Sequence, residues 1–316
     1  MAHAPPELAK LATEEVPCPL CGAEGGRLLS KQLGRFGVVK CGRCGLVRLS
    51  PRLTADAARR LYDAAYYAAG GYDDYVKTFE RFRDIYERLF AKRLALLSRH
   101  VAGPGRILEC GCAHGFQLEW LRRQGWEVVG NDVSAEAAAY ARERFGLEVV
   151  EAPLEKAALE AASFDAVYLV DIVEHLYDVA AALANVRAAL KPGGVTLIQV
   201  PYELYHWEKL GQARWERKKA GTVAPDGVPY HVTFFTPRTL RLMLRKCGFR
   251  ILARYSGNYG AIRMRLSPPK IRADSAAETA ARFIYYKLGL RAALRGFARA
   301  FQQGSGIIYV AAPEKG

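Results

Sequence analysis

Between residues 106 and 200 the chain alternates between short apolar runs and longer stretches with helical periodicity. Short runs rich in Val, Ile and Leu are typical of buried strands, and apolar residues spaced by three and four indicate amphipathic helices. This alternation predicts an α/β fold, a parallel sheet covered by helices on both faces. The expected strands are 106–108, 127–130, 147–150, 164–170 and 195–200, and the expected helices are 116–124, 135–145 and 179–190.

The pattern changes on both sides of this region. Towards the N-terminus, residues 51–104 predict helices, one over 56–62 and a longer amphipathic one over 76–100, and we interpret them as a helical linker or lid. Towards the C-terminus, an irregular insert begins at Pro201. A helix over 236–247 follows it, and strands are expected at 249–255 and 306–312.

Residues 1–50 contain four cysteines in two close pairs, Cys18 with Cys21 and Cys41 with Cys44, separated by nineteen residues. Two such knuckles can place four thiolates tetrahedrally around Zn²⁺. Gly22 and Gly45 follow the pairs, where a side chain would crowd the backbone N–H groups that turn towards the sulfurs. Four protein ligands leave no position for a substrate, so this segment predicts a structural zinc ribbon. Iron in the same thiolate cage is the alternative.

The formal net charge of +14 lies almost entirely in the C-terminal quarter. Residues 238–299 hold fifteen basic and two acidic residues. Within 275–303, apolar residues at helical spacing predict an amphipathic helix with a basic face. Such a helix can lie on an anionic membrane surface, or it can cover the protein's own sheet or a second copy.

No run of uncharged apolar residues reaches the length of a membrane span, and residues 1–16 lack the apolar core of a secretory signal. Cysteine pairs in a chain without an export signal favour metal over disulfides. We therefore expect a cytoplasmic protein, with peripheral membrane contact through 275–303 as a further possibility.

The turn after the first strand of the sheet carries the main candidate site. Glu109 can hold an ammonium group, and Gly111 and Gly115 allow a ligand to approach the backbone closely. The second strand ends at Asp132, whose carboxylate can accept both hydroxyls of a ribose. A nicotinamide dinucleotide is the alternative ligand. It would require G-x-G-x-x-G spacing, and the acid before Gly111 would repel its pyrophosphate.

With these motifs the chain resembles the class I S-adenosylmethionine-dependent methyltransferases over roughly residues 105–255. The resemblance implies a Rossmann-like seven-stranded methyltransferase sheet with S-adenosylmethionine bound at its carboxyl edge. The segments that carry it are Glu109–Gly115, Val129–Ser134, Ser163–Val167, Val173–Leu176, Leu190–Gly194, His231–Leu240 and Cys247–Phe249. The cofactor-binding residues that it implies are Glu109, Gly111, His114, Gly115, Asp132, Leu154 and Asp171.

The N-terminal segment is similar to that of bacterial methyltransferases with a fused zinc ribbon. The similarity is carried by Cys41–Val47, Ser50–Arg52, Leu61–Tyr62 and Tyr66–Tyr67. It implies a sugar-like, glycan or secondary-metabolite acceptor, and the excess positive charge suits an acceptor carried on a nucleotide or lipid diphosphate. The implied domains are 1–50 (ribbon), 51–104 (linker or lid) and 105–316 (methyltransferase), with 201–235 and 256–304 as substrate or partner elements.

Methyl transfer to a hydroxyl or C–H acceptor requires removal of a proton, so the domain needs a base near the carboxyl edge of its sheet. We predict His231 as this base, with Tyr230 and His175 shaping the acceptor site. The alternatives are that His231 only fixes the insert by a hydrogen bond and that His175 packs beneath the cofactor.

Two other functions stay open from the sequence. The first is an RNA methyltransferase that grips RNA through the ribbon and the basic C-terminal region, although no basic and aromatic interleaving typical of RNA binding is found. The second is a non-catalytic module that binds the cofactor. The sequence predicts no oligomeric state.

Overall fold

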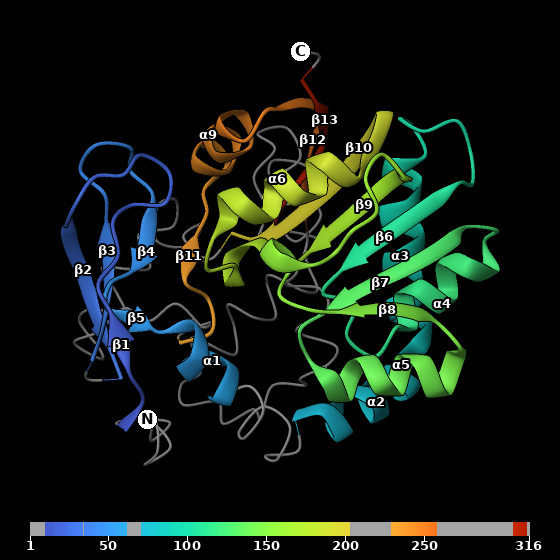
Figure 1. Cartoon of the computed structure of the whole chain (residues 1–316), viewed down its shortest axis with the longest axis horizontal. Helices are drawn as coiled ribbons and strands as arrows, with labels where there is room; N and C mark the ends of the chain where they lie inside the picture. The colour runs from blue at the N-terminus through green and yellow to red at the C-terminus, as the bar shows by residue number, and fades with distance from the viewer. Residues whose placement is uncertain (1–9, 34, 62–70, 203–228, 258–305, 315–316) are drawn as a thin grey trace, which may run out of the picture.

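The computed structural model describes residues 10–33, 35–61, 71–202, 229–257 and 306–314. A seven-stranded sheet forms the centre of the molecule (Figure 1). Its strand order is β12-β13-β10-β9-β6-β7-β8, in which β13 runs antiparallel to both neighbours and the other pairs described are parallel. This confirms the predicted Rossmann-like α/β fold. The strands are β6 (Arg106–Cys110), β7 (Glu127–Asp132), β8 (Glu148–Glu151), β9 (Phe164–Val170), β10 (Leu190–Pro201), β12 (Phe249–Gly257) and β13 (Gly306–Pro313).

Both faces of this sheet are buried, because side chains alternate between faces along each strand. Ile107 belongs to a core cluster with Leu97 and Leu121, whereas its neighbour Leu108 belongs to a different cluster with Leu183. Helices therefore cover both faces, which explains the nearly continuous apolar runs of the strands. Within the described residues, the α-helices after β6 are α4 (Phe116–Arg123), α5 (Ala135–Phe145), α6 (Val179–Ala189) and α9 (Pro237–Lys246).

The helix expected over 76–100 is wrong as a single element. The chain forms α2 (Gly71–Arg81) and α3 (Arg83–Leu97), and Phe82 between them has φ −122° and ψ 25°. The apolar spacing continues in step through the break, so periodicity could not reveal it. Phe79 of α2 stacks on Phe116 of α4 with ring centroids 3.9 Å apart, and Phe90 of α3 also packs in this aromatic cluster.

The N-terminal segment forms small antiparallel sheets followed by α1 (Ala55–Leu61). The larger of them has the order β11-β4-β3-β2, and β11 (Thr233–Phe234) lies in sequence between strands β10 and β12 of the central sheet. Figure 1 shows β11, in orange, beside the blue strands. The segment's own strands are β1 (Thr13–Glu14), β2 (Arg27–Gln32), β3 (Phe36–Lys40), β4 (Val47–Leu49) and β5 (Arg52–Leu53).

This shared sheet joins the N-terminal segment to the rest of the protein. Phe36 and Leu46 of the segment lie in the same continuous buried cluster as Met243 of α9 and Ile198 of β10. The insert that begins at Pro201 was expected to be irregular, and β11 was not predicted within it. The predicted domain boundary at residue 50 therefore does not separate two packing units, because one buried cluster continues across it. The boundary stays a prediction about the different chemical roles of the two parts.

Among the described helices, none is both long and apolar enough to cross a bilayer. The amphipathic helix expected over 275–303 lies outside the described residues.

Candidate functional site

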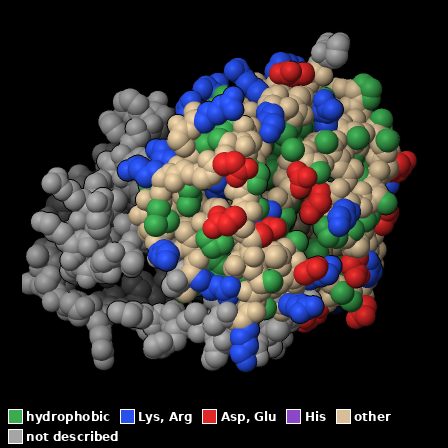
Figure 2. Space-filling view, turned by 60° about the vertical axis from the view of Figure 1, so that its left-hand side comes forward, with side chains coloured by type: hydrophobic (Ala, Val, Ile, Leu, Met, Phe, Trp, Pro, Cys, Tyr) green, Lys and Arg blue, Asp and Glu red, His purple; other side chains and the backbone are tan. Residues whose placement is uncertain are grey.

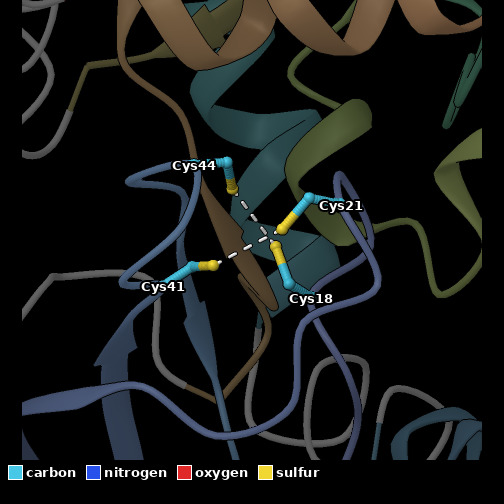
Figure 3. A group of neighbouring side chains, drawn as sticks. All are labelled: Cys18, Cys21, Cys41 and Cys44. Atoms are coloured by element: carbon cyan, nitrogen blue, oxygen red, sulfur yellow. Dashed lines mark hydrogen bonds between the residues drawn. The ribbon is translucent and has the colours of Figure 1, made fainter.

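The four cysteines predicted to bind metal converge on one point (Figure 3). The sulfurs of Cys18 and Cys44 lie 3.4 Å apart, those of Cys21 and Cys41 lie 3.5 Å apart, and all four lie within 4.8 Å of one another. Tetrahedral zinc with Zn–S bonds of about 2.3 Å requires sulfurs about 3.8 Å apart. The arrangement fits a four-thiolate ion site.

Glycine follows each cysteine pair because of its backbone conformation, and not because of the crowding expected from the sequence. Gly22 and Gly45 have φ of +73° and +80°, and their N–H groups donate to the carbonyls of Cys18 (2.8 Å) and Cys41 (3.0 Å). A Cβ on Gly22 would meet nothing within 4 Å, so crowding does not exclude a side chain there. The left-handed backbone of the turn favours glycine instead.

Basic side chains of α9 contact both cysteine pairs from outside. Arg238 donates to the carbonyl of Cys44 at 2.8 Å, and Lys246 donates to the carbonyl of Pro19 at 3.1 Å. Lys and Arg side chains gather along the upper part of the face in Figure 2, the level at which α9 lies in Figure 1. Four thiolates around a divalent ion carry net negative charge, so these cations complement it.

The first cofactor-binding candidate, Glu109, is buried at the end of β6 with 6% of its surface exposed. Its Oε1 accepts a hydrogen bond from Gln117 Nε2 at 2.7 Å, whereas Oε2 has no partner among the described residues. Burial raises the pKa of Glu109 to about 8. A buried carboxylate with one open oxygen fits a cationic ligand group such as an ammonium.

Arg93 of α3 is linked to the Glu109 carboxylate through the side chain of Gln117. It donates to Gln117 Oε1 at 2.7 Å and to Gln199 Oε1 at 3.3 Å, and Gln199 in turn donates to Asp171 Oδ2 at 3.4 Å. Asp171, also predicted from the resemblance, follows β9 with φ +55°. One hydrogen-bonded chain therefore connects two predicted cofactor carboxylates.

The turn after Glu109 has an unusual backbone. Gly111, Ala113 and Gly115 all have positive φ, at +69°, +47° and +76°. A Cβ on Gly111 would meet Ile172 at 2.8 Å, and one on Gly115 would meet Leu147 at 2.7 Å. The positive φ favours glycine at both positions, and a side chain there would displace the ends of Ile172 and Leu147. That the two glycines also admit a ligand stays a prediction.

Asp132, the last residue of β7, connects this turn to β7 by hydrogen bonds. Its Oδ2 accepts from the N–H of Ala113 at 2.8 Å and its Oδ1 from the N–H of Ser134 at 2.9 Å. Leu154, predicted to lie beside an adenine, is buried in a short 3₁₀ turn (Leu154–Lys156) whose first carbonyl accepts from Asn185 at 2.8 Å. The ends of β6, β7 and β9 therefore bring Glu109, Asp132 and Asp171 to one edge of the sheet.

His114, predicted to line the cofactor site, lies inside an aromatic cluster. It is 4% exposed, with its ring 5.6 Å from that of Tyr75 and in edge contact with that of Tyr140 at 4.7 Å. Burial lowers the pKa of His114 to about 4, so its ring is neutral at physiological pH. These contacts give it a packing role, and contact with a ligand stays a prediction.

The predicted acceptor-side residues do come together. His175 ends a 3₁₀ turn (Val173–His175) after β9, and its ring meets that of His231 at 4.6 Å between centroids. The Nδ1 of His175 lies 3.2 Å from the backbone carbonyl of Tyr230, to which a protonated Nδ1 donates. Burial and the neighbouring His231 lower the pKa of His175 to about 3, which keeps it neutral.

Three functional residues were missed from the sequence. Arg93 follows Phe90 by three positions on the apolar face of its helix, a place where a basic residue indicates a buried partner. Gln117 lies on the first turn of the helix after the glycine turn, but no motif marked it. Arg52 was noted only within a motif, and it contacts Tyr177 close to the histidine pair.

Comparison with known proteins gives a consistent picture. Residues 78–254 match the family model described as a methyltransferase domain. The chain is 31% identical over 124 residues to a probable S-adenosylmethionine-dependent methyltransferase of Mycolicibacterium smegmatis, a match that covers 39% of this chain and 45% of that protein. It is 29% identical over 170 residues to a ubiquinone biosynthesis O-methyltransferase of Xanthomonas axonopodis, covering 50% of this chain and 69% of that one.

Among solved structures, the chain is similar to phosphoethanolamine N-methyltransferase 2 of Haemonchus contortus in complex with S-adenosyl-L-methionine. The TM-score is 0.52 at 17% sequence identity, and the superposition covers 85% of this chain and 63% of that chain. At this identity the likeness concerns the fold.

Proposed function

This chain belongs to the methyltransferase-domain family, and on that premise we propose that it transfers the methyl group of S-adenosylmethionine to a small, sugar-like or glycan acceptor. The observation that carries the proposal is the carboxyl edge of the sheet. Glu109, a buried carboxylate with an open oxygen, lies at the end of β6, and His175 follows β9, which pairs directly with β6. The ring of His231, which lies just before β11, contacts the ring of His175. Ligands of open α/β sheets bind at this edge.

For the cofactor, we propose that Glu109 Oε2 accepts from the ammonium group and that Asp132 accepts from the ribose hydroxyls. Each oxygen of Asp132 already accepts one backbone N–H, which orients the carboxylate and leaves a second acceptor position. Leu154 would contact the adenine, with His114, Gly111, Gly115 and Asp171 completing the surroundings. When bound, S-adenosylmethionine supplies a methyl group on a positively charged sulfur.

For the acceptor, we propose His231 as the base that removes the proton. His175 beside it is held neutral, and its Nδ1–H donates to the Tyr230 carbonyl, which fixes the tautomer of the ring. Tyr230 thereby shapes the site through its backbone. A base in hydrogen-bond reach of the acceptor is worth about 10²–10⁴ in rate.

For the cysteines, we propose a structural Zn²⁺ held by Cys18, Cys21, Cys41 and Cys44. Backbone N–H groups of Cys44 and Arg43 lower the pKa of Cys41, whereas burial raises the pKa values of Cys18 and Cys44 when no ion is bound. A thiolate is the form that binds metal. We assign residues 1–50 to this ribbon, 51–104 to a linker or lid and 105–316 to the catalytic domain.

The acceptor class rests on resemblance and on relatives. The name of the Xanthomonas relative records O-methylation in ubiquinone biosynthesis, which supports a small acceptor. Exposed basic residues of α9 would suit an acceptor carried on a nucleotide or lipid diphosphate, at a cytoplasmic or membrane-peripheral location.

The test is incubation with methyl-labelled S-adenosylmethionine and separate small-molecule, glycan and RNA fractions, with His231→Gln as the matched variant. We expect label in the small-molecule or glycan fraction and a loss of about 10²-fold or more in the variant. Label confined to RNA would replace the acceptor class. Cofactor binding without transfer to any fraction would favour a non-catalytic module.

A further inference from the structure

The ribbon contacts the chain directly after His231. Strand β4 pairs with β11 in the register Thr233 to Arg48 and Phe234 to Val47, and the N–H of Leu49 donates to the carbonyl of Val232 at 3.0 Å. The N–H of Val232 points the other way and donates to the carbonyl of Glu174 at 2.9 Å. Val232 is therefore held between the ribbon and the turn that carries His175.

Strand β5, directly after the ribbon, makes a second, independent contact two residues after His175. The guanidinium of Arg52 on β5 donates to the carbonyl of Tyr177 at 3.2 Å and lies over the Tyr177 ring, 4.4 Å from its centroid. On its other side it forms an ion pair with Glu14 on β1 at 2.8 Å. The planar guanidinium can make all three contacts together, which an ammonium cannot.

The cysteine knuckle sets the position of β4. The N–H of Cys41 donates to the carbonyl of Leu46 at 2.8 Å, so the knuckle closes onto the residue before β4 begins. An ion bound by Cys41 and Cys44 would hold this hairpin and therefore the strand that pairs with β11.

The described contacts of the carboxylates predicted to bind the cofactor come from parts of the chain other than the ribbon. Glu109 is bonded through Gln117 to Arg93 of α3, and Asp132 is bonded to the N–H groups of Ala113 and Ser134. Among the described residues, none of these partners belongs to the ribbon. The cofactor carboxylates and the acceptor-side histidines are thus held in place by different parts of the chain.

We propose that the cysteine ribbon, together with β5 that follows it and pairs with its β1, is the positioning element of the acceptor half of the site, in which β4 and Arg52 set the relative placement of His231 and His175. The inference rests on the proposed roles of His231 as base and of the cysteines as zinc ligands. It makes Arg52 a positioning residue, and it makes methyl transfer, but not cofactor binding, depend on an intact ribbon.

The test compares Arg52→Gln and Arg52→Lys with the control Arg59→Gln, an exposed arginine on α1 that pairs only with Asp56 among the described side chains. For Arg52→Gln we expect the affinity for S-adenosylmethionine to stay within about twofold and kcat to fall about 10- to 100-fold. Arg52→Lys should recover part of the loss, and Arg59→Gln should match the parent protein. Bound zinc and unfolding midpoints are measured for each variant.

A second measurement uses the resting protein with no substrate. Nitrogen-15 NMR of the imidazoles reports the tautomer of His175, and ring-to-ring nuclear Overhauser contacts report its distance from His231. We expect Arg52→Gln, and reversibly also zinc removal from the full chain, to weaken these contacts while calorimetry still shows cofactor binding.

Two results would overturn the inference. Unchanged histidine signals in Arg52→Gln and in zinc-depleted protein would show that the ribbon does not place the rings. Equal losses of cofactor affinity and histidine contacts would show that the ribbon only stabilises the whole fold. Failure of the proposed function gives a different pattern, namely full activity of His231→Gln or absence of bound zinc in the parent protein.

Discussion

The ring of His231 meets the ring of His175 edge to face, with centroids 4.6 Å apart and planes at 87°. Burial first, and then the proximity of His231, lower the pKa of His175, which keeps the His175 ring neutral. One neutral ring with a fixed tautomer beside a second imidazole is an arrangement suited to accepting a single proton from an acceptor.

The histidine pair yields the first prediction. His231→Gln keeps a side chain of similar size that can form hydrogen bonds but removes the base. We expect kcat to fall about 10²- to 10⁴-fold with cofactor affinity unchanged. Single-turnover transfer and calorimetry measure the two quantities separately. A variant with full activity would leave His231 with the structural role that the sequence also allowed.

The buried carboxylate yields a prediction about pH. With a pKa of about 8 Glu109 is protonated at pH 7, and an ammonium ligand favours its ionised form, so binding should release a proton. Affinity for S-adenosylmethionine should therefore rise by up to about tenfold per pH unit between pH 6 and 8. Above about pH 8 ionisation of Glu109 is complete, and affinity should fall again as the ligand's own α-amino group loses its charge.

Calorimetry at pH 7 in buffers of different ionisation heat measures the released proton. The control is Glu109→Gln, which has no carboxyl group to titrate and should show weak binding without this proton release. Equal proton release in the variant and the parent protein would assign the proton to another group.

Arg93 yields a prediction about cofactor affinity. Arg93→Leu removes the charge that lowers the pKa of Glu109 and leaves Gln117 without its donor. We expect affinity at pH 7 to fall about tenfold or more, the size of one hydrogen bond to a charged group. Arg88→Leu, on the same helix but exposed and paired with Asp84, is the matched control and should bind normally. Equal losses in both variants would indicate damage to the helix.

His114 yields a prediction about acid stability. Its folded pKa of about 4 lies below the unfolded value of about 6.5, so below pH 6.5 the unfolded chain takes up a proton that the folded protein refuses. Stability is therefore lost as pH falls from 6.5 to 4. Compared with His114→Gln, the parent protein should lose about 2 kcal/mol more between pH 7.5 and 5.

Urea unfolding at the two pH values measures this difference. His175 also has a lowered pKa, but it is present in both proteins and its contribution cancels. Parallel losses in the parent protein and in His114→Gln would contradict the assignment.

The cysteine centre yields a prediction about metal. We expect one zinc ion per chain by elemental analysis and loss of the ion in Cys44→Ser. Cys247→Ser, which changes a half-buried cysteine directly after α9 and outside the centre, should keep the ion. If the ion is iron, the protein will be coloured, and the alternative of an iron centre with the same four thiolates will replace zinc.

The sequence predicted most of the central sheet, because both faces of it are buried and each strand appears as an apolar run. Val195 to Val200 and Phe164 to Val170 were placed within a few residues of β10 and β9. The cysteine pairs were equally clear, since their spacing is dictated by the ion. Glu109 and Asp132 could be placed because the ends of parallel strands share one edge.

The remaining features depend on contacts between distant residues. The apolar stripe is the same with or without the break at Phe82, and the stacking of Phe79 on Phe116 joins residues that no local pattern relates. The pairing of β11 with β4 requires knowing that Thr233 lies opposite Arg48, which two residues of strand cannot show. Gln117 and Arg93 are linked only through the fold, so no local pattern marked them.

The strand β11 has a consequence for biosynthesis. Val47 and Phe234 are made far apart in time, so the ribbon can capture its ion on the ribosome well before its fourth strand exists. During that interval β4 exposes an unpaired backbone edge, which is the kind of surface that recruits strands from neighbouring nascent chains. Aggregation through β4 is therefore expected during translation and not after release of the finished chain, in which β11 covers this edge.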